Sequence, residues 1–587
     1  MIKYLNFLKF TKAKTSQKNI FRDRTRFLFF ILLFILLLIL FRLYSIQVIH
    51  SEVYKQKAQD QYVRESSRFY DRGEIYFLTK DGNEVVAATM KDWYILALDI
   101  RKIKNTNKLY KELSKIIFID KNRFDRATKK KGDPYEEIAK GLTKEEKNKI
   151  EKLKLPGVLL VKERKRYYPA NQHAAQTIGF VGFTKKSDEK KGVYGLEKYY
   201  EDVLHRSDST LRVNFFAQLF SDLKGFVFAP STKREGDIVL TIEPNTQIYL
   251  EDTIEKMRKK WESEMTAGII INPKTGAILA MAISPTFDLN NYSNANTKLF
   301  SNILIQDVYE MGSIVKPITM ASAINEGLVN ANTTYNDRGF VRIGDRTIYN
   351  FDKRGRGPRT TMQDVISESL NTGVVFVLHK MGKKTFRRYF NKFGLNEETG
   401  IDMPNEPMNL ISNLDTNRDI EYATATFGQG IALTPISMTR ALCAIATGEL
   451  PQPHLVSKIR STNGLVDNRD YSDLKIKVLK DETVHEITKM LVKAVDTKLL
   501  GGSMKIKNYS VAAKTGTAQI AKRSGGYYSR DVLHTYFGYF PAYEPKFLVF
   551  LMNLKPHGAK YSSQTISKYF FDIVHFLIDY YDIPPDR

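Results

Sequence analysis

The chain has 587 residues, with 90 lysines and arginines against 65 aspartates and glutamates, so its formal net charge is +25. This length allows two or three domains with cores of their own, and 43% hydrophobic residues exclude an intrinsically disordered protein. A single cysteine, Cys443, excludes a fold held by internal disulfides. The charge excess leaves nucleic acid, anionic lipid and acidic polymers open as partners.

The first 49 residues predict a membrane anchor. Residues 27–41 are all apolar, and the pattern continues beyond Arg42 to residue 49, which is long enough to cross a bilayer if Arg42 reaches the interface. Residues 1–26 carry eight basic side chains against one acid, which predicts a cytoplasmic tail with the rest of the chain outside. The alternative is a cleaved signal peptide, but no small-x-small site follows Phe41. Because most of the remaining charge then lies outside the cytoplasm, nucleic acid is not expected as a partner.

Residues 50–235 are mixed and lysine-rich, and they form the first domain predicted outside the membrane. Thr143 and Glu146 have the spacing of a capping box that begins a solvated helix. Pro156-Gly157 interrupts the chain before a strand predicted at 158–161.

A second domain is predicted over residues 236–587. It begins with a strand at 237–242, a helix at 246–261, and two strands at 267–271 and 277–282 joined by a turn. Mostly helical patterns follow, and strands return at 510–520, 533–540 and 547–554 before an apolar-faced helix at 563–581. Strands at both ends with helices between them predict an α/β (α+β) domain with a sheet covered by helices.

A serine and a lysine three residues apart form the first candidate catalytic pair. Ser313 and Lys316 lie in Gly-Ser-Ile-Val-Lys-Pro, just before an apolar, helix-prone segment. Positions i and i+3 of a helix share a face, so Lys316 can reach the Ser313 hydroxyl. Serine becomes nucleophilic when a base removes its proton, and a lysine whose pKa is lowered by burial or a second cation can act as that base. Three other Ser-x-x-Lys matches lie in polar stretches and indicate solvated surface.

Ser369 and Asn371 form the second candidate pair. Two residues apart, they can point from a turn into one cleft and act as a proton relay and an amide-binding group. Helix capping is the alternative interpretation of the same two residues.

The third motif is Lys514-Thr515-Gly516-Thr517, in a strand-like run of small residues. Glycine weakens a strand interior, so its presence indicates a close approach of another backbone. An extended peptide along this strand edge would gain ladder hydrogen bonds, with Lys514 as the cation for a terminal carboxylate. The three motifs in this order are those of penicillin-binding proteins and class A β-lactamases.

The chain resembles the class B penicillin-binding proteins, which are membrane-anchored, monofunctional peptidoglycan transpeptidases. Residues 285–288, 309–317 and 428–435 look like signatures of the transpeptidase domain, and residues 72–75, 166–169 and 195–197 look like pedestal motifs. The chain departs from the family pattern at Met311, Ile314 and Leu370, where proline, threonine, and serine or aspartate are usual. The likeness is greatest to the division-specific branch, with the elongation branch as the alternative.

The resemblance implies a fold, a site and a reaction. The fold is a serine-transpeptidase domain with a central, mainly antiparallel sheet, preceded by an elongated pedestal of the dimerisation type and one transmembrane helix. Ser313 would be the acyl-ester nucleophile toward the penultimate D-alanine of a stem peptide. The implied supporting residues are Lys316 as base, Ser369 as relay, Asn371 bonding Lys316 and the substrate amide, Lys514 holding the relay, and Thr515, Gly516 and Thr517 in substrate binding. The backbone N–H groups of Ser313 and Thr517 would form the oxyanion hole. No metal or cofactor is implied.

The resemblance also implies partners and a location. The partners are D-Ala-D-Ala stem peptides, β-lactams, membrane lipid, a SEDS-type glycosyltransferase and membrane proteins of the division complex. The location is the bacterial cytoplasmic membrane, crossed once, with the catalytic domain outside. Two other classes stay open: a β-lactam sensor or β-lactamase-like serine enzyme, in which Glu368 is the nearest candidate for activating water, and a non-catalytic division scaffold.

Overall fold

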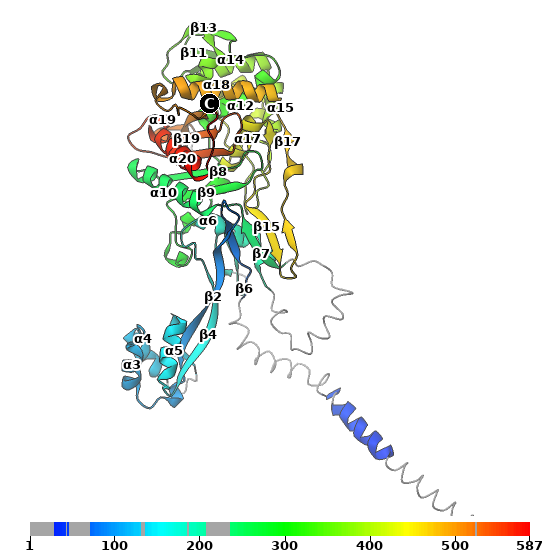
Figure 1. Ribbon diagram of the computed structural model, residues 1–587, viewed down its shortest axis with the longest axis vertical. Coiled ribbons are helices and arrows are strands. Elements are labelled where there is room, and N and C mark those ends of the chain that lie inside the picture. Colours follow the sequence, from blue (N-terminus) through cyan, green and yellow to red (C-terminus); the bar gives the residue numbers. More distant parts are fainter. Residues whose placement is uncertain are drawn as a thin grey trace, which may run out of the picture. The chain divides into compact units, whose positions relative to one another are not determined.

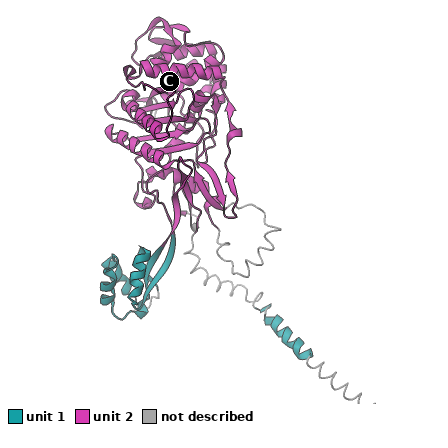
Figure 2. Cartoon of the chain, viewed as in Figure 1, with its two compact units in different colours: residues 1–70, 93–164 teal, residues 71–92, 165–587 magenta. Residues whose placement is uncertain are grey.

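The computed structural model describes residues 29–42, 44–45, 71–130, 135–184, 187–206, 235–522 and 525–587 (Figure 1). They belong to two compact units (Figure 2). The first contains Trp93–Arg164 together with the chain up to Tyr70, and the second contains Asp71–Asp92 and Lys165–Arg587. These units are groups of residues that pack mainly against one another. They do not test the domain boundaries predicted at residues 26, 49 and 235, which stay predictions.

Part of the predicted anchor, 27–49, lies within the described residues. Residues 29–42 are helical, with exposed apolar side chains, whereas residues 1–28, 43 and 46–49 lie outside the described residues. Within the described chain, no helix combines the length and hydropathy that a membrane crossing requires.

The first unit is a small helical layer packed on strands. The end of β2 (Glu84–Leu98) pairs antiparallel with β3 (Glu136–Leu142) and is also paired with β4 (Val158–Tyr167). Three helices pack against these strands through Leu113, Phe124 and Ile150: α3 (Thr106–Ser114), α4 (Lys121–Thr128) and α5 (Lys144–Lys152). The capping box predicted from Thr143 and Glu146 begins α5, and the strand predicted at 158–161 lies in β4.

A five-stranded sheet forms the centre of the second unit, and all its neighbouring strands are antiparallel. Its order is β18 (Ala512–Ala521), β19 (Tyr527–Phe540), β20 (Phe547–Leu554), β8 (Met265–Ile271) and β9 (Ile278–Ser284). The strands predicted at 267–271, 277–282, 510–520, 533–540 and 547–554 are therefore confirmed, and they lie in one sheet although more than 200 residues separate β9 from β18. The strand predicted at 237–242 is also confirmed, as β7 (Gly236–Leu240), but it pairs with β1 (Ile75–Leu78) and β15 (Val456–Ser461) in a separate sheet.

Alternating side chains of this sheet enter two cores. Ile270 contacts a cluster that includes α10 (Pro244–Lys260) and α20 (Ser567–Tyr580), whereas Ile269 and Ile271 point into a larger cluster of helices. Period-two alternation of this kind is required when both faces of a sheet are covered. The larger cluster includes side chains of α12 (Lys316–Asn325), α17 (Pro435–Thr447) and α18 (Asp481–Thr497). Figure 1 labels these three helices in the second unit.

The remaining described elements of the second unit support this centre. The helices are α6 (Ala175–Ile178), α7 (Gly195–Tyr199), α8 (Glu201–Leu204), α11 (Ile303–Gln306), α12 (Lys316–Asn325), α13 (Met362–Ser367), α14 (Asn371–Met381), α15 (Lys383–Lys392), α16 (Asp419–Ala425), α17 (Pro435–Thr447), α18 (Asp481–Thr497) and α19 (Ser562–Thr565). The further strands are β1 (Ile75–Leu78), β5 (Val181–Thr184), β6 (Ser187–Gly192), β7 (Gly236–Leu240), β10 (Thr334–Asp337), β11 (Phe340–Ile343), β12 (Arg346–Tyr349), β13 (Gly357–Thr361), β14 (Glu449–Leu450), β15 (Val456–Ser461), β16 (Val466–Asn468) and β17 (Ile476–Lys477).

Glu197 joins the three motifs that resemble the pedestal of the family. Its carboxylate is fully buried and accepts hydrogen bonds from Arg72 Nε, from Arg166 Nε at 2.7 Å and from Tyr168 Oη at 3.2 Å. Arg72 also pairs with Glu201 at 2.7 Å. Burial by itself raises the pKa of Glu197, but Arg166 and Arg72 outweigh it, so the pKa lies below its ordinary value. The motifs therefore form one buried ionic cluster.

Candidate active site

Ser313 lies in a single 3-10 turn, Gly312–Val315, which leads directly into α12. Ser313 is half-buried. Gly312 has φ +61°, and a Cβ there would lie 2.8 Å from the carbonyl oxygen of Thr517. A residue with a side chain at 312 would therefore force the nucleophile segment and β18 apart. The helix predicted after Ser313 is confirmed.

Lys316 is fully buried at the start of α12. Its Nζ donates to the carbonyl oxygen of Ser369 at 2.5 Å and contacts Ser369 Oγ at 3.1 Å. The lysine of the first motif is thus hydrogen-bonded to the serine of the second motif and lies one helical turn after Ser313.

Ser369 occupies the junction between α13 and α14. Its φ is +57°, a left-handed conformation that is uncommon for residues other than glycine. The N–H of Leu370 bonds to the carbonyl of Val365 at 3.0 Å, as in the Schellman ending of a helix. Holding serine in this conformation costs on the order of 1 kcal/mol. The turn places its hydroxyl between two lysines.

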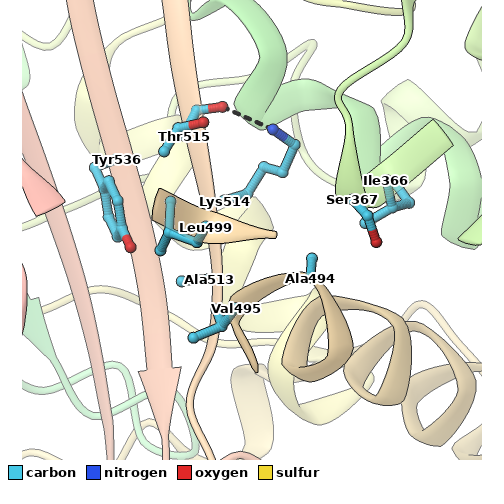
Figure 3. A pocket seen from close by; sticks show the side chains of 9 residues that line it. All are labelled: Ile366, Ser367, Ala494, Val495, Leu499, Ala513, Lys514, Thr515 and Tyr536. Carbon is cyan, nitrogen blue, oxygen red and sulfur yellow. Dashed lines mark hydrogen bonds between the residues drawn. The ribbon is translucent and has the colours of Figure 1, made fainter. Parts of the chain in front are cut away.

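Lys514 is the second of these lysines. Its Nζ lies 3.1 Å from Ser369 Oγ. It also donates to the carbonyl of Thr515 at 3.0 Å (Figure 3). Behind it is a cavity of about 40 Å³, lined mainly by apolar side chains. The lining residues come from α13, α18, β18 and their neighbours: Ile366, Ser367, Ala494, Val495, Leu499, Ala513, Lys514, Thr515 and Tyr536.

Burial sets the protonation of both lysines. It lowers the pKa of Lys316 well below the ordinary value, and the charge of Lys514 lowers it further. Burial likewise lowers the pKa of Lys514 to about 7. Since an ammonium cannot take a proton, these shifts make a neutral amine available near neutral pH.

Asn371 and the two threonines of the third motif also lie around this group. Asn371 begins α14, and its Nδ2 donates to the carbonyl of Tyr349 at 2.8 Å, which fixes the orientation of the amide. Among the described residues Lys316 Nζ bonds to Ser369 and not to Asn371, so the bond between Lys316 and Asn371 that the resemblance implied is not formed here. Thr517 Oγ1 accepts from the N–H of Ser562 at 3.2 Å. Thr515 and Gly516 lie between Lys514 and Thr517 on β18. The structure therefore gathers all three motifs predicted from the sequence.

The three departures from the family pattern are all in the core. Met311 is 1% exposed, and Ile314 and Leu370 are fully buried. Their side chains pack into the larger hydrophobic cluster, so these substitutions change packing beneath the site.

Three further residues support the site: Thr535 and Ser562, which have no local signal in the sequence, and Gly428. Thr535 Oγ1 donates to the carbonyl of Met311 at 2.9 Å, and Ser562 Oγ donates to the carbonyl of Thr535 at 2.7 Å. Gly428, with φ +76°, comes so close to the nucleophile segment that its carbonyl accepts from the N–H of Gly312 at 3.1 Å. Strand register and tertiary packing bring Thr535 and Ser562 to the nucleophile segment, whereas Gly428 belongs to the signature at residues 428–435.

Comparison with known proteins identifies the family. Residues 266–574 match the family model described as penicillin binding protein transpeptidase domain, and residues 70–218 match the penicillin-binding protein dimerisation domain. The chain is a class B penicillin-binding protein. This confirms the resemblance seen in the sequence motifs.

Relatives of this penicillin-binding protein are similar over most of their length. Stage V sporulation protein D of Bacillus subtilis is 27% identical over 546 residues, which is 90% of this chain and 82% of that protein. The peptidoglycan D,D-transpeptidase FtsI of Escherichia coli is 26% identical over 420 residues, 71% of this chain and 67% of that protein.

Solved structures show the same fold. Penicillin binding protein 2X from Streptococcus thermophilus superposes with a TM-score of 0.72 at 21% identity, covering 87% of this chain and 79% of that chain. Penicillin binding protein 3 from Mycobacterium tuberculosis, complexed with ampicillin, superposes with a TM-score of 0.65 at 19% identity. The match covers 88% of this chain and 96% of that chain. The transpeptidase fold with a central antiparallel sheet and a two-domain architecture is therefore confirmed.

Gly516 controls how closely β18 approaches the nucleophile segment of this penicillin-binding protein. A Cβ there would lie 2.2 Å from Thr535 Oγ1 and 2.9 Å from the carbonyl oxygen of Met311. We expect Gly516→Ala to displace the strand and slow acylation by penicillin by about 100-fold, because misplacement by 1 Å has effects of this size. The acylation rate constant measures this. Gly182→Ala is the control, since its Cβ would make an ordinary contact at 3.4 Å; equal rates for both variants would contradict the prediction.

Proposed function

We propose that this chain is a membrane-anchored peptidoglycan D,D-transpeptidase that cross-links stem peptides through an acyl-enzyme on Ser313. The observation that carries this proposal is the contact of Ser369 Oγ with both Lys316 and Lys514, each at 3.1 Å, one helical turn from Ser313. This arrangement suits acyl transfer, because it places a nucleophile, Ser313, one helical turn from a buried amine that can act as base, and beside that amine a serine that can relay a proton.

In the acylation step, Ser313 Oγ attacks the carbonyl carbon of the penultimate D-alanine. Neutral Lys316 accepts the hydroxyl proton, which then passes through Ser369 to the amine nitrogen of the terminal D-alanine as the C–N bond breaks. Thr515 and Thr517 bind the carboxylate of that leaving residue, and Asn371 binds the donor amide. The backbone N–H groups of Ser313 and Thr517 stabilise the oxyanion, worth about 3 kcal/mol for each donor.

In the second step, an amine of a neighbouring stem peptide attacks the ester carbonyl. The new C–N bond forms the cross-link, the bond to Ser313 Oγ breaks, and a proton from the attacking nitrogen returns to Oγ through the lysine–serine group. Lys316 therefore acts as a base when Ser313 is acylated, and as an acid when a proton returns to Ser313 Oγ in the second step.

The proposed location rests on the sequence of the first 49 residues, and the proposed partners rest on the family resemblance. Residues 27–49 are proposed as the anchor and residues 1–26 as the cytoplasmic tail, so that the catalytic domain faces the cell envelope. There it would meet membrane lipid, a SEDS-type glycosyltransferase and proteins of the division complex. A septal role is proposed, with elongation as the alternative, and complementation of cells that lack one or the other enzyme distinguishes them.

A β-lactamase-like activity is less well supported, because it needs a carboxylate that activates water. Glu368 precedes Ser369, but it accepts hydrogen bonds from Arg356 Nε and Lys498 Nζ, both at 3.0 Å. Burial raises its pKa, yet the bonds from Lys498 and Arg356 outweigh this and lower it overall. A carboxylate held in two ion pairs is a weak base.

Labelling with a fluorescent penicillin tests the proposal. We expect one covalent adduct, located by mass spectrometry on the peptide that contains Ser313, and stable over hours because deacylation by water is slow. Release of hydrolysed penicillin within minutes would indicate a β-lactamase, and the absence of an adduct on Ser313 would refute the proposed nucleophile.

A further inference from the structure

Glu310 is a carboxylate next to the nucleophile that the mechanism above does not use. It lies three residues before Ser313 on the same segment and is half-buried. Its Oε1 accepts from the N–H of Gly430 at 3.2 Å. The Tyr527 hydroxyl contacts Oε1 at 3.1 Å and Oε2 at 3.2 Å. These contacts fix the carboxylate beside the site.

The strand register places this carboxylate on one side of Ser313. Thr517 is paired with His534, whereas Ala521 is paired with Tyr527, so Tyr527 lies at the far end of the β18–β19 pair from Lys514. Thr517 is proposed to bind the carboxylate of the departing D-alanine. Glu310, held by Tyr527, therefore lies beyond Thr517 along β18, on the side away from Lys514, and three residues before Ser313.

The surroundings of Glu310 leave its charge uncompensated in the part of the chain that the structure describes. Both groups that donate to it there, a phenol and a backbone amide, are neutral. Burial raises the pKa of Glu310, and the bonds from Tyr527 and Gly430 offset this only in part. A half-buried carboxylate of this kind is stabilised when a cation binds to it.

We propose that Glu310 binds the primary ammonium group of the acceptor stem peptide and thereby favours amine over water in the second step. This rests on the proposed function and extends it to the acceptor. The bound ammonium releases one proton to solvent to become the nucleophile, and its nitrogen gives up the second proton to Ser313 Oγ as the ester bond breaks. Binding at Glu310 raises the local concentration of the amine next to the acyl-enzyme.

The experiment compares attack by different nucleophiles on one acyl-enzyme. The full-length chain in detergent is acylated with a thioester analogue of D-Ala-D-Ala, and N-acetyl-lysinamide, methanol and water compete for the acyl group. Glu310→Gln keeps a carbonyl oxygen that can accept from Gly430 and Tyr527, so it removes the charge while leaving the contacts. Tyr527→Phe is the matched control, because it removes the hydroxyl and leaves the charge.

We expect Glu310→Gln to lower the ratio of aminolysis to hydrolysis by about tenfold or more, the effect of losing one charge-assisted hydrogen bond. Its methanolysis ratio and its rate of acylation by penicillin should match the wild type, and Tyr527→Phe should retain most aminolysis. An unchanged aminolysis ratio in Glu310→Gln, or an equal loss in Tyr527→Phe, would overturn the proposal and indicate a structural tether. Loss of penicillin acylation in folded Glu310→Gln would also overturn it.

A measurement on the wild-type chain covers the case in which the variant does not fold. N-acetyl-trimethyllysinamide carries the positive charge but cannot attack, so it should inhibit aminolysis while leaving penicillin acylation unchanged. An absence of inhibition would overturn the role of Glu310. Failure of the proposed function is distinct, because Ser313 would then not be acylated at all.

Discussion

Lys316→Met is expected to lower the rate of acylation by penicillin by about 1,000-fold while the protein remains folded. General base catalysis contributes factors of this order, and methionine fills nearly the same volume without a basic nitrogen. The variant also removes the contacts of Nζ with Ser369, so the relay loses its partner. Stopped-flow labelling gives the rate, and circular dichroism checks the fold.

The wild-type pH profile is part of the same prediction. Since burial and Lys514 lower the pKa of Lys316, the neutral and active form accumulates at a pH well below that of an ordinary lysine. Acylation should therefore rise with pH and reach its plateau below the pH of about 10 at which an ordinary lysine loses its proton. Lys274→Met, on an exposed lysine, is the control and should leave the rate unchanged. A profile that rises only near the pKa of a free lysine would contradict the assignment of the base.

Glu197→Gln is expected to destabilise the second unit by about 3–5 kcal/mol, because removing one partner of a buried ion pair leaves uncompensated charge. Arg166 and Arg72 are both almost fully buried against Glu197, and Arg72 also pairs with Glu201. Chemical denaturation monitored by tryptophan fluorescence measures the change in the free energy of unfolding. Penicillin acylation of the folded fraction should persist, because the cluster acts on stability.

The effect of this substitution should depend on pH. The pKa of Glu197 is lowered in the folded chain, so its contribution to stability is present above the ordinary glutamate pKa and is lost as the pH falls toward the folded value. The difference between variant and wild type should therefore shrink in acid. Glu544→Gln serves as control, since its carboxylate is 82% exposed and its pair with Lys274 is worth less than about 1 kcal/mol. Equal destabilisation by both variants would contradict a special role for the buried cluster.

The sequence predicted the elements of the sheet better than their arrangement. Alternating and apolar runs identified β8, β9, β18, β19 and β20, because each is a local pattern. Their order, which puts β18 at an edge and β20 beside β8, depends on contacts between distant segments. The compact units also divide the chain at Asp92 and Arg164, inside β2 and β4, where no break in composition marks the change.

Residues of the candidate site were likewise predictable only where a local motif marked them. Ser313, Lys316 and Lys514 were predicted because short motifs carried them. The left-handed turn at Ser369 had no signal, since serine rarely adopts it and only the packing around α13 and α14 determines it. Glu310 belongs to a signature segment of the sequence. The role proposed for its carboxylate depends on the contact with Tyr527, which the strand register makes possible.

Cys443 has a practical consequence. It is fully buried in α17, and burial raises the pKa of its thiol, so the reactive thiolate form is suppressed. Since it is the only cysteine of 587 residues, an oxidant has no exposed thiol of this chain to attack. A cysteine introduced on the surface would thus be the single reactive position, and maleimide dyes or spin labels could be attached there without first altering the native chain.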